Sequence, residues 1–341
     1  MNSFTKPKLK KYEKVQFDDK LTFGQRFKLK YINPYFLRNL LIKFFRFVFL
    51  VGISYIVLFP FITKISGSFM SITDFVDVQV KLIPKNFTLD TYKAIVLENK
   101  YWQALLNTSI LSIGLGAIQM IVCALVGYGF SKFKFKGSSL LFLGVLLTMI
   151  IPHQTLQMSL FMKFRFFDIW GIGGLITSAL GAKLPNLLGS AWPLIIMSAT
   201  GLAFRNGLFI FVMRQFYRGI PDELEEAAYV DGAGPLRTFV QIILPLSIPM
   251  MVTIFMFAFS WQWSDTFYTN LFFSSSSNFI LMPDIVKIPA SLNSKGFVGQ
   301  TAFETAINNT CGLLILLPLV VVYLFAQKTL IQGIERSGVT G

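Results

Sequence analysis

Long apolar runs separated by short polar stretches dominate the pattern of this chain. The runs fall at about 47–65, 104–130, 138–160, 188–213, 246–264 and 311–327. A helix rises about 1.5 Å per residue, so roughly 20 apolar residues cross the ~30 Å hydrocarbon core of a bilayer. The pattern therefore predicts an all-α polytopic membrane protein with six transmembrane helices.

The charges between the runs predict an orientation. Residues 1–46 hold twelve Lys or Arg against three acids, and residues 131–137 hold three lysines and no acid. Such basic excess beside a span marks the cytoplasmic side. Arg214 and Arg336 mark later cytoplasmic segments in the same way. We therefore expect both termini in the cytoplasm, although residues 163–186, expected outside, are basic too.

The chain is expected to contain two parts. Residues 1–45 form a basic cytoplasmic tail, which ends in an interfacial helix over about 31–46, and residues 46–341 form the transmembrane domain. The tail is interpreted as a solvated segment that also contacts anionic lipid. Its lysines before residue 20 are Lys6, Lys8, Lys10, Lys11 and Lys14.

Composition supports lipid as the solvent of this protein. The chain has 341 residues, of which 54% are hydrophobic and 14% charged, and its mean hydropathy is +0.60. A soluble domain carries about 25% charged residues. The formal charge of +14 lies mainly in the tail and short loops. That placement is typical of orientation signals and argues against nucleic acid as a partner.

Residues that could carry catalysis are sparse. His153 is the one histidine, and Cys123 and Cys311 both fall in apolar runs. A multi-histidine metal site is excluded, no cofactor is predicted, and His153 is interpreted as a hydrogen-bonded core residue. Residues 294–299 come nearest to a nucleotide-binding phosphate loop but lack its spacing. No catalytic residue is therefore assigned.

The most informative segment is residues 220–235. Pro221 suits the first position of a helix, and acidic residues follow in the opening turns, where the helix dipole favours them. Gly232 can adopt the left-handed conformation that ends a helix, and Pro235 then starts the next one. A helix of roughly ten residues is unstable alone in water, so this one needs a partner surface. A plain surface helix between two spans is the alternative.

This segment resembles a known motif. Glu226-Ala227-Ala228, Gly232 and Ile242-x-Leu244-Pro245 have the spacing of the EAA loop of permease subunits in binding-protein-dependent ABC importers. Four other stretches resemble the carbohydrate-uptake permeases of the maltose G-subunit type: Leu82–Tyr92, Tyr128–Phe133, Met213–Phe216 and Trp263–Asp265. The resemblance covers about 46–341.

The resemblance implies a type I ABC importer permease fold in a bacterial inner membrane. The chain would form half the translocation pathway of a sugar (oligosaccharide) importer. Its partners would be a second permease, identical or different, two ABC ATPase subunits that hydrolyse the ATP, and an extracellular solute-binding protein. The EAA loop, about 217–245, would couple to the ATPase through Glu226, Ala227, Ala228, Asp231 and Gly232.

Two alternatives stay open. The same architecture could import a peptide or a polyamine, and the sequence names no particular solute. A polytopic membrane enzyme or sensor is the alternative of a different class. The EAA loop argues against it, because neither has reason to present this helix–Gly–helix.

Three residues are candidates for the solute path. Trp261 and Asp265 are four residues apart and would share a helical face, where a sugar could stack on the ring and hydrogen-bond to the carboxylate. Trp263 points ~160° away and is expected to pack against a neighbour or lipid. Arg205 lies inside the predicted fourth span, where a charge is costly, so it would line or gate the passage or form a structural pair.

Overall fold

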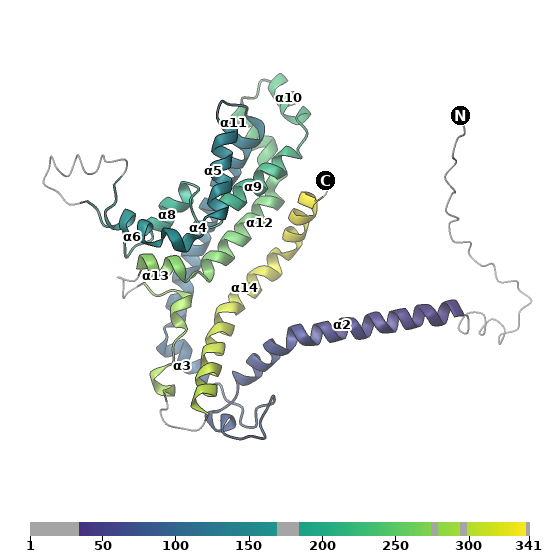
Figure 1. Ribbon diagram of the computed structural model, residues 1–341, viewed down its shortest axis with the longest axis vertical. Coiled ribbons are helices and arrows are strands. Elements are labelled where there is room, and N and C mark those ends of the chain that lie inside the picture. The colour runs from purple at the N-terminus through teal and green to yellow at the C-terminus, as the bar shows by residue number, and fades with distance from the viewer. Residues whose placement is uncertain (1–33, 169–183, 274–278, 294–298, 339–341) are drawn as a thin grey trace, which may run out of the picture. The chain divides into compact units, whose positions relative to one another are not determined.

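The computed structural model describes residues 34–168, 184–273, 279–293 and 299–338 (Figure 1). The predicted basic tail up to residue 33, most of the predicted connection over 163–186 and residues 274–278 lie outside these residues. The chain divides into one unit that ends at Thr63 and a second that starts at Lys64. All regular elements described are helices, apart from an isolated bridge between Met70 and Phe87. The described part is thus all-α, as predicted.

Helix α2 (Pro34–Gly67) accounts for the first predicted span. It is one continuous helix, so no break separates the interfacial helix expected over 31–46 from the span. Pro34 stands at its first position, where a missing backbone N–H is harmless. Its side chains are exposed from Arg38 to Ile62, and its apolar composition suits contact with lipid.

Three further long helices contain the predicted second, fifth and sixth spans. They are α4 (Tyr101–Lys132), α12 (Leu244–Trp263) and α14 (Gln300–Gly338). With α2 they make four helices long and apolar enough to cross a membrane, or five crossings if one bent pair is included, among the residues described. The predicted count of six is therefore not confirmed.

The third predicted span is broken. Helices α5 (Ser138–Ile150) and α6 (Gln157–Arg165) are joined through the short helix η2 (His153–Leu156), with a bend of 99°. Ile151 is extended, with φ −69° and ψ 119°. The ring of Pro152 disfavours a helical conformation at the residue before it, which explains the break.

The fourth predicted span is also interrupted, between α8 (Trp192–Ala199) and α9 (Asn206–Arg218). Gly201 has φ +74°, and the N–H groups of Gly201 and Leu202 donate to Ser198 and Met197 across the end of α8. These two bonds form a Schellman cap. Arg205, which the sequence places inside the fourth span, lies at this break, where it precedes α9 with φ +67°.

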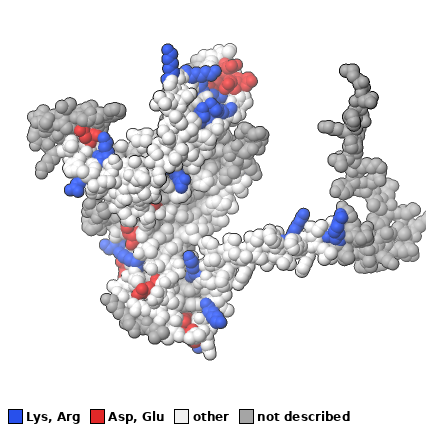
Figure 2. All heavy atoms as spheres, viewed as in Figure 1, with Lys and Arg blue, Asp and Glu red and all other residues white. Residues whose placement is uncertain are grey.

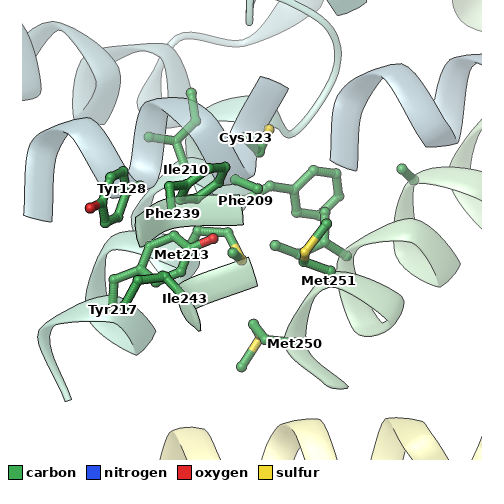
Figure 3. Close-up of a cluster of buried hydrophobic side chains, with 13 residues drawn as sticks. Cys123, Tyr128, Phe209, Ile210, Met213, Tyr217, Phe239, Ile243, Met250 and Met251 are labelled. Carbon is green, nitrogen blue, oxygen red and sulfur yellow. The ribbon is translucent and has the colours of Figure 1, made fainter. Parts of the chain in front are cut away.

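Helix α4 packs against α8, α9 and α12. Figure 3 shows the buried cluster that joins α4, α9 and α12, in which Tyr128 and Phe239 pack with rings 4.7 Å apart. A Cβ built on Gly127 would lie 2.6 Å from the Cβ of Met213. The absence of a side chain at Gly127 thus permits the close approach of α4 and α9.

The end of the bundle away from α10 (Glu223–Val230) and α11 (Pro235–Thr238) in Figure 1 carries α3 (Asp90–Glu98) and several short helices and loops. Asn99 Nδ2 donates to the carbonyls of Ile285 (2.9 Å) and Lys287 (2.8 Å). Asp74 is buried and accepts hydrogen bonds from Asn86 N, Asn86 Nδ2 and Lys85 N at 2.8–3.2 Å. Buried contacts between side chains and backbone groups thus help to hold this end together, and an ion pair between Lys85 and Asp77 (3.0 Å) lies at its surface.

Candidate functional site

The EAA-like segment forms a helix–Gly–helix unit at the end of the bundle opposite α3 (Figure 1). Helix α10 (Glu223–Val230) is followed by α11 (Pro235–Thr238), which begins at Pro235 as predicted. Pro221, in contrast, lies before α10 rather than at its first position, because Asp222 is the N-cap. From α11 the chain runs through a π-helical turn, η3 (Phe239–Ile243), into α12.

The predicted left-handed glycine is confirmed. Gly232 has φ +80°. Its N–H donates to the carbonyl of Tyr229 (3.0 Å), and the N–H of Ala233 donates to that of Ala228 (2.9 Å). This pair of bonds is a Schellman cap, and its left-handed residue is nearly strain-free only for glycine.

Helix α10 has an inner and an outer face. Glu225 and Ala228 are buried, whereas Glu226 and Ala227 are exposed and so is Asp231 beyond the helix. Acidic side chains gather at this end, as Figure 2 shows. Exposed apolar side chains adjoin them: Leu224, Val230 and Leu236. The outer face thus combines carboxylates with apolar surface.

Lys132 contacts this segment from the last position of α4. Its side chain is only 7% exposed. Its Nζ lies 2.6 Å from Asp222 Oδ1, 2.9 Å from the carbonyl oxygen of Ile220 and 3.5 Å from Glu225 Oε1. The sequence indicated a loop lysine that signals orientation, and it held no sign of these partners about 90 residues away.

The contact changes the chemistry of Asp222. The hydrogen bond and the positive charge of Lys132 hold the pKa of the Asp222 carboxyl below its ordinary range, and burial opposes them only weakly. Asp222 therefore stays ionised across the neutral pH range. Its carboxylate remains available to Lys132 there.

Two of the three candidate solute-path residues lie together. The guanidinium carbon of Arg205 is 4.7 Å from the ring centre of Trp261 and 4.9 Å from that of Phe204. Both distances fit cation–π contacts. Arg205 therefore lies against Trp261 at the break between α8 and α9.

Asp265 reaches the same region by a different route from the one predicted. Helix α12 ends at Trp263, so the argument from a shared helical face fails for Asp265. Its carboxylate accepts from Thr269 N (2.8 Å) and Tyr268 N (3.3 Å) at the start of α13 (Phe267–Phe273). Trp263 is buried and donates to the carbonyl of Ile315 on α14 (3.0 Å), in agreement with its expected packing.

A small cavity, lined by both polar and apolar side chains, lies beside Trp261 and Asp265. Its volume is about 20 Å³, which admits one water-sized group. Trp261 and Asp265 line it together with Gln119 of α4 and Gln262 of α12. Gln119 Oε1 and Gln262 Nε2 are buried without a hydrogen-bond partner in the described structure. Neither glutamine was predicted from the sequence, although Gln119 is an isolated polar residue within the apolar run of the second predicted span.

A larger cavity, about 720 Å³ and mostly apolar, lies beside it and is lined by His153, Leu156, Phe164, Leu202 and Tyr268, among others. His153 Nδ1 and Tyr268 Oη are 2.7 Å apart. His153 is thus hydrogen-bonded, as expected. Within the described residues, no group of three or more His, Cys, Asp or Glu side chains is placed to hold a metal ion.

The structure thus combines long apolar helices, four of them long enough to cross a membrane among the residues described, with an exposed helix–Gly–helix unit. Residues 120–336 match the family described as the binding-protein-dependent transport system inner membrane component. The chain belongs to this family, as its EAA-like motif predicted. Its members are permease components, so the prediction that the chain is not itself an enzyme is confirmed.

Several relatives cover most of the chain. It is 27% identical to the polygalacturonan/rhamnogalacturonan transport system permease protein YtcP of Bacillus subtilis, over 89% of this chain and all of YtcP. It is 27% identical to the galactooligosaccharides transport system permease protein GanQ of the same organism, covering 87% and 95% of the two chains. The trehalose transport system permease protein SugB of Mycobacterium tuberculosis is 29% identical, with 76% and 85% covered.

A solved structure confirms the fold. One chain of a bacterial ABC transporter involved in the import of the acidic polysaccharide alginate superposes with a TM-score of 0.61. The match has 20% sequence identity and covers 85% of this chain and 97% of that chain. The described helices thus have the fold of an ABC importer permease.

Proposed function

We propose that this chain is the transmembrane permease subunit of an ATP-driven importer of sugars, with oligosaccharides as the substrate class. The three relatives above are permeases for saccharides by name, which favours sugar over a peptide or a polyamine. The observation that carries the proposal is the helix–Gly–helix unit with its left-handed Gly232. A short exposed helix that cannot stand alone needs a partner, and an importer supplies an ATPase.

The proposed assembly contains this chain, a second permease, two ATPase subunits and an extracellular solute-binding protein.

Six crossings result if α5 with α6 and α8 with α9 each count as one broken span. Broken helices are tolerated at membrane depth where they line a cavity. Both termini and α10 are then cytoplasmic, so a cysteine at Ser131 should resist impermeant reagents from outside. Labelling there would refute this topology.

The substrate class is tested by transport. The chain, copurified with its ATPase and second permease, is reconstituted in liposomes with the solute-binding protein. Neutral and acidic oligosaccharides, a peptide and a polyamine are offered in turn. We expect ATP-dependent uptake of an oligosaccharide. Uptake of the peptide or polyamine without any saccharide would contradict the proposal.

The coupling role is proposed for α10. Glu226 and Ala227 lie outward and would contact the ATPase, whereas Ala228 lies inward and would allow α10 to sit close to the bundle. Gly232→Val forces a β-branched residue to φ +80°, at roughly 1–3 kcal/mol. We expect normal insertion but loss of coupled uptake. Gly234→Ala, at φ −77° with open space around it, is the matched control and should transport normally.

The solute path is proposed to pass the cluster of Arg205, Trp261 and Asp265. Trp261 is 45% exposed, so its ring can receive a sugar face. Trp261→Ala and Asp265→Ala should each reduce uptake while assembly and basal ATP hydrolysis persist. Trp192→Ala, which removes another exposed tryptophan, is the control. Unchanged uptake in the Trp261 and Asp265 variants would remove this cluster from the path.

A further inference from the structure

Helix α10 has few contacts that hold it to the bundle. Glu225 and Ala228 are its buried residues, and the rest of the helix is exposed. Lys132 contacts this helix from the end of α4, and its side chain is almost fully buried. Three oxygens surround its ammonium group, from Ile220, Asp222 and Glu225.

We propose that Lys132 is a positioning residue that clasps the coupling helix α10 to α4, so that α10 and α4 move together. The clasp is defined as Lys132 with Asp222, Glu225 and the carbonyl of Ile220. The inference rests on the proposed function, since it names the residue through which the coupling helix acts on the bundle.

The clasp pairs a buried cation with two hydrogen-bond acceptors and one nearby carboxylate. Lys132 Nζ donates to the carbonyl of Ile220 and to Asp222 Oδ1, and it lies 3.5 Å from Glu225 Oε1, which has no hydrogen-bond partner in the described structure. Glu225 is 8% exposed in its side chain, whereas Asp222 is 80% exposed. Removal of Lys132 therefore leaves the Glu225 carboxylate buried without its partner, which is strongly unfavourable. Asp222 would simply return to water.

The last turns of α4, which carry Lys132, pack tightly against neighbouring helices. Gly127 lets α4 approach Met213 closely, and the ring of Tyr128 packs against those of Tyr217 and Phe239. A displacement of α10 is thus passed to the body of α4 rather than absorbed at its end.

Helix α4 also reaches from the clasp to the small cavity beside Trp261 and Asp265. Gln119, which lines that cavity with Trp261, lies thirteen residues before Lys132, or roughly 20 Å along the helix axis. One continuous helix therefore carries both the contact with α10 and a wall of the proposed solute path. The clasp lies at the last turn of α4, and Gln119 lies near its middle.

The first test measures whether the clasp holds α10. Cys123 and Cys311 are replaced by Ala, and Ala228→Cys places a thiol on the inner face of α10 of the full chain in detergent. We expect slow labelling by a soluble maleimide, whereas Val230→Cys, 87% exposed in the parent, labels quickly. Lys132→Met should raise the Ala228→Cys labelling rate about tenfold, and Lys132→Arg should not.

Matched variants separate the clasp from general charge effects. Lys136→Met removes an exposed lysine of the same loop, and Glu223→Gln removes an α10 carboxylate outside the clasp. Both should leave labelling unchanged. Lys132→Met combined with Glu225→Met should label more slowly than Lys132→Met alone, because no buried carboxylate remains unpaired.

The second test measures coupling. In liposomes with the ATPase and binding protein, Lys132→Met should keep basal ATP hydrolysis but lower sugar uptake per ATP hydrolysed about tenfold, with Lys132→Arg retaining most of it. Unchanged labelling in Lys132→Met overturns the clasp. Increased labelling with unchanged uptake per ATP overturns its role in coupling. A parent chain that transports no sugar overturns the proposed function, while the labelling result still decides the clasp.

Discussion

The two ends of the helical bundle are held by different interactions. At the α3 end, buried side chains bind backbone groups: Asn99 spans two carbonyls, and Trp263 reaches the carbonyl of Ile315. At the α10 end, one lysine binds two carboxylates and one carbonyl, and most of α10 is exposed. These contacts of the first end join buried side chains to backbone groups, and its ion pair between Lys85 and Asp77 lies at the surface. The second end depends on a buried lysine and a helix that is mostly exposed.

The difference separates a fixed part from a movable one. Buried hydrogen bonds are expensive to leave unmade, so the α3 end has one favourable arrangement. A pair that includes an exposed carboxylate exchanges with water at little net loss, so the α10 end is the less costly of the two to displace, while the buried Lys132–Glu225 pair keeps α10 together with α4. The following variants test this contrast, from the largest expected effect to the smallest.

The largest effect is expected for Trp263→Ala at the α3 end. The change leaves a cavity among the buried residues and removes the donor to Ile315, with a loss of about 3–5 kcal/mol of stability. Thermal unfolding in detergent and folding yield should both fall. Trp102→Ala, at a tryptophan 68% exposed, should change neither much. Equal effects would show that the buried contacts of Trp263 do not stabilise the α3 end.

The next effect is expected where α4 meets α9. Gly127→Ala forces a Cβ to 2.6 Å from that of Met213, and such overpacking costs typically about 1–3 kcal/mol. The same substitution two residues later, Gly129→Ala, meets open space and should be neutral or slightly stabilising. The difference between the two unfolding temperatures measures how tightly α4 packs against α9 next to the clasp. Equal temperatures would contradict a tight contact.

A smaller effect concerns acid at the α3 end. Burial raises the pKa of Asp74, but hydrogen bonds from Asn86 and Lys85 outweigh it and hold the pKa below its ordinary value. A depressed pKa adds stability that is present above the unfolded value, near 4, and is lost as the pH falls through the folded value. Unfolding followed over an acid series should show this loss. In Asp74→Asn, which is less stable at neutral pH, this contribution should vanish.

The smallest effect is expected for salt at the α10 end. Raising the ionic strength from about 0.1 to 1 M shortens the screening length from ~10 to ~3 Å and weakens the exposed Lys132–Asp222 pair. Labelling of Ala228→Cys should rise slightly, and Asp222→Asn should remove the salt dependence. A cysteine at buried Ile285, on the α3 end, should show no change with salt. A salt response of equal size at both ends would remove the contrast.

Local sequence signals predicted much of this architecture. Apolar length alone located α4, α12 and α14, because a helix that satisfies its own backbone is the simplest way to cross lipid. The unit from α10 to Pro235 was also predictable, since Gly232 and Pro235 end and begin helices by their own backbone preferences. These features depend on a few neighbouring residues.

The helix breaks were harder to predict, although their causes are local. Pro152 and Gly201 lie within continuous apolar runs, and in a membrane protein the apolar signal conceals such breaks. Arg205 consequently lies at the break between α8 and α9, against Trp261, and not within one continuous helix. Gly201 and Pro152 favour these breaks, but the hydropathy of the runs does not reveal them.

The sequence alone thus determined which segments are apolar enough to cross a membrane and where the helix–Gly–helix unit lies, because hydropathy and helix capping depend on nearby residues. Only the tertiary structure decided that Lys132 meets Asp222 and Glu225, and that Asp265 caps α13 beside Trp261. A lysine in a basic loop predicts, through its charge, on which side of the membrane the loop lies. Its partners follow from where α4 ends relative to α10, and that geometry is set by the packing of helices far apart in sequence.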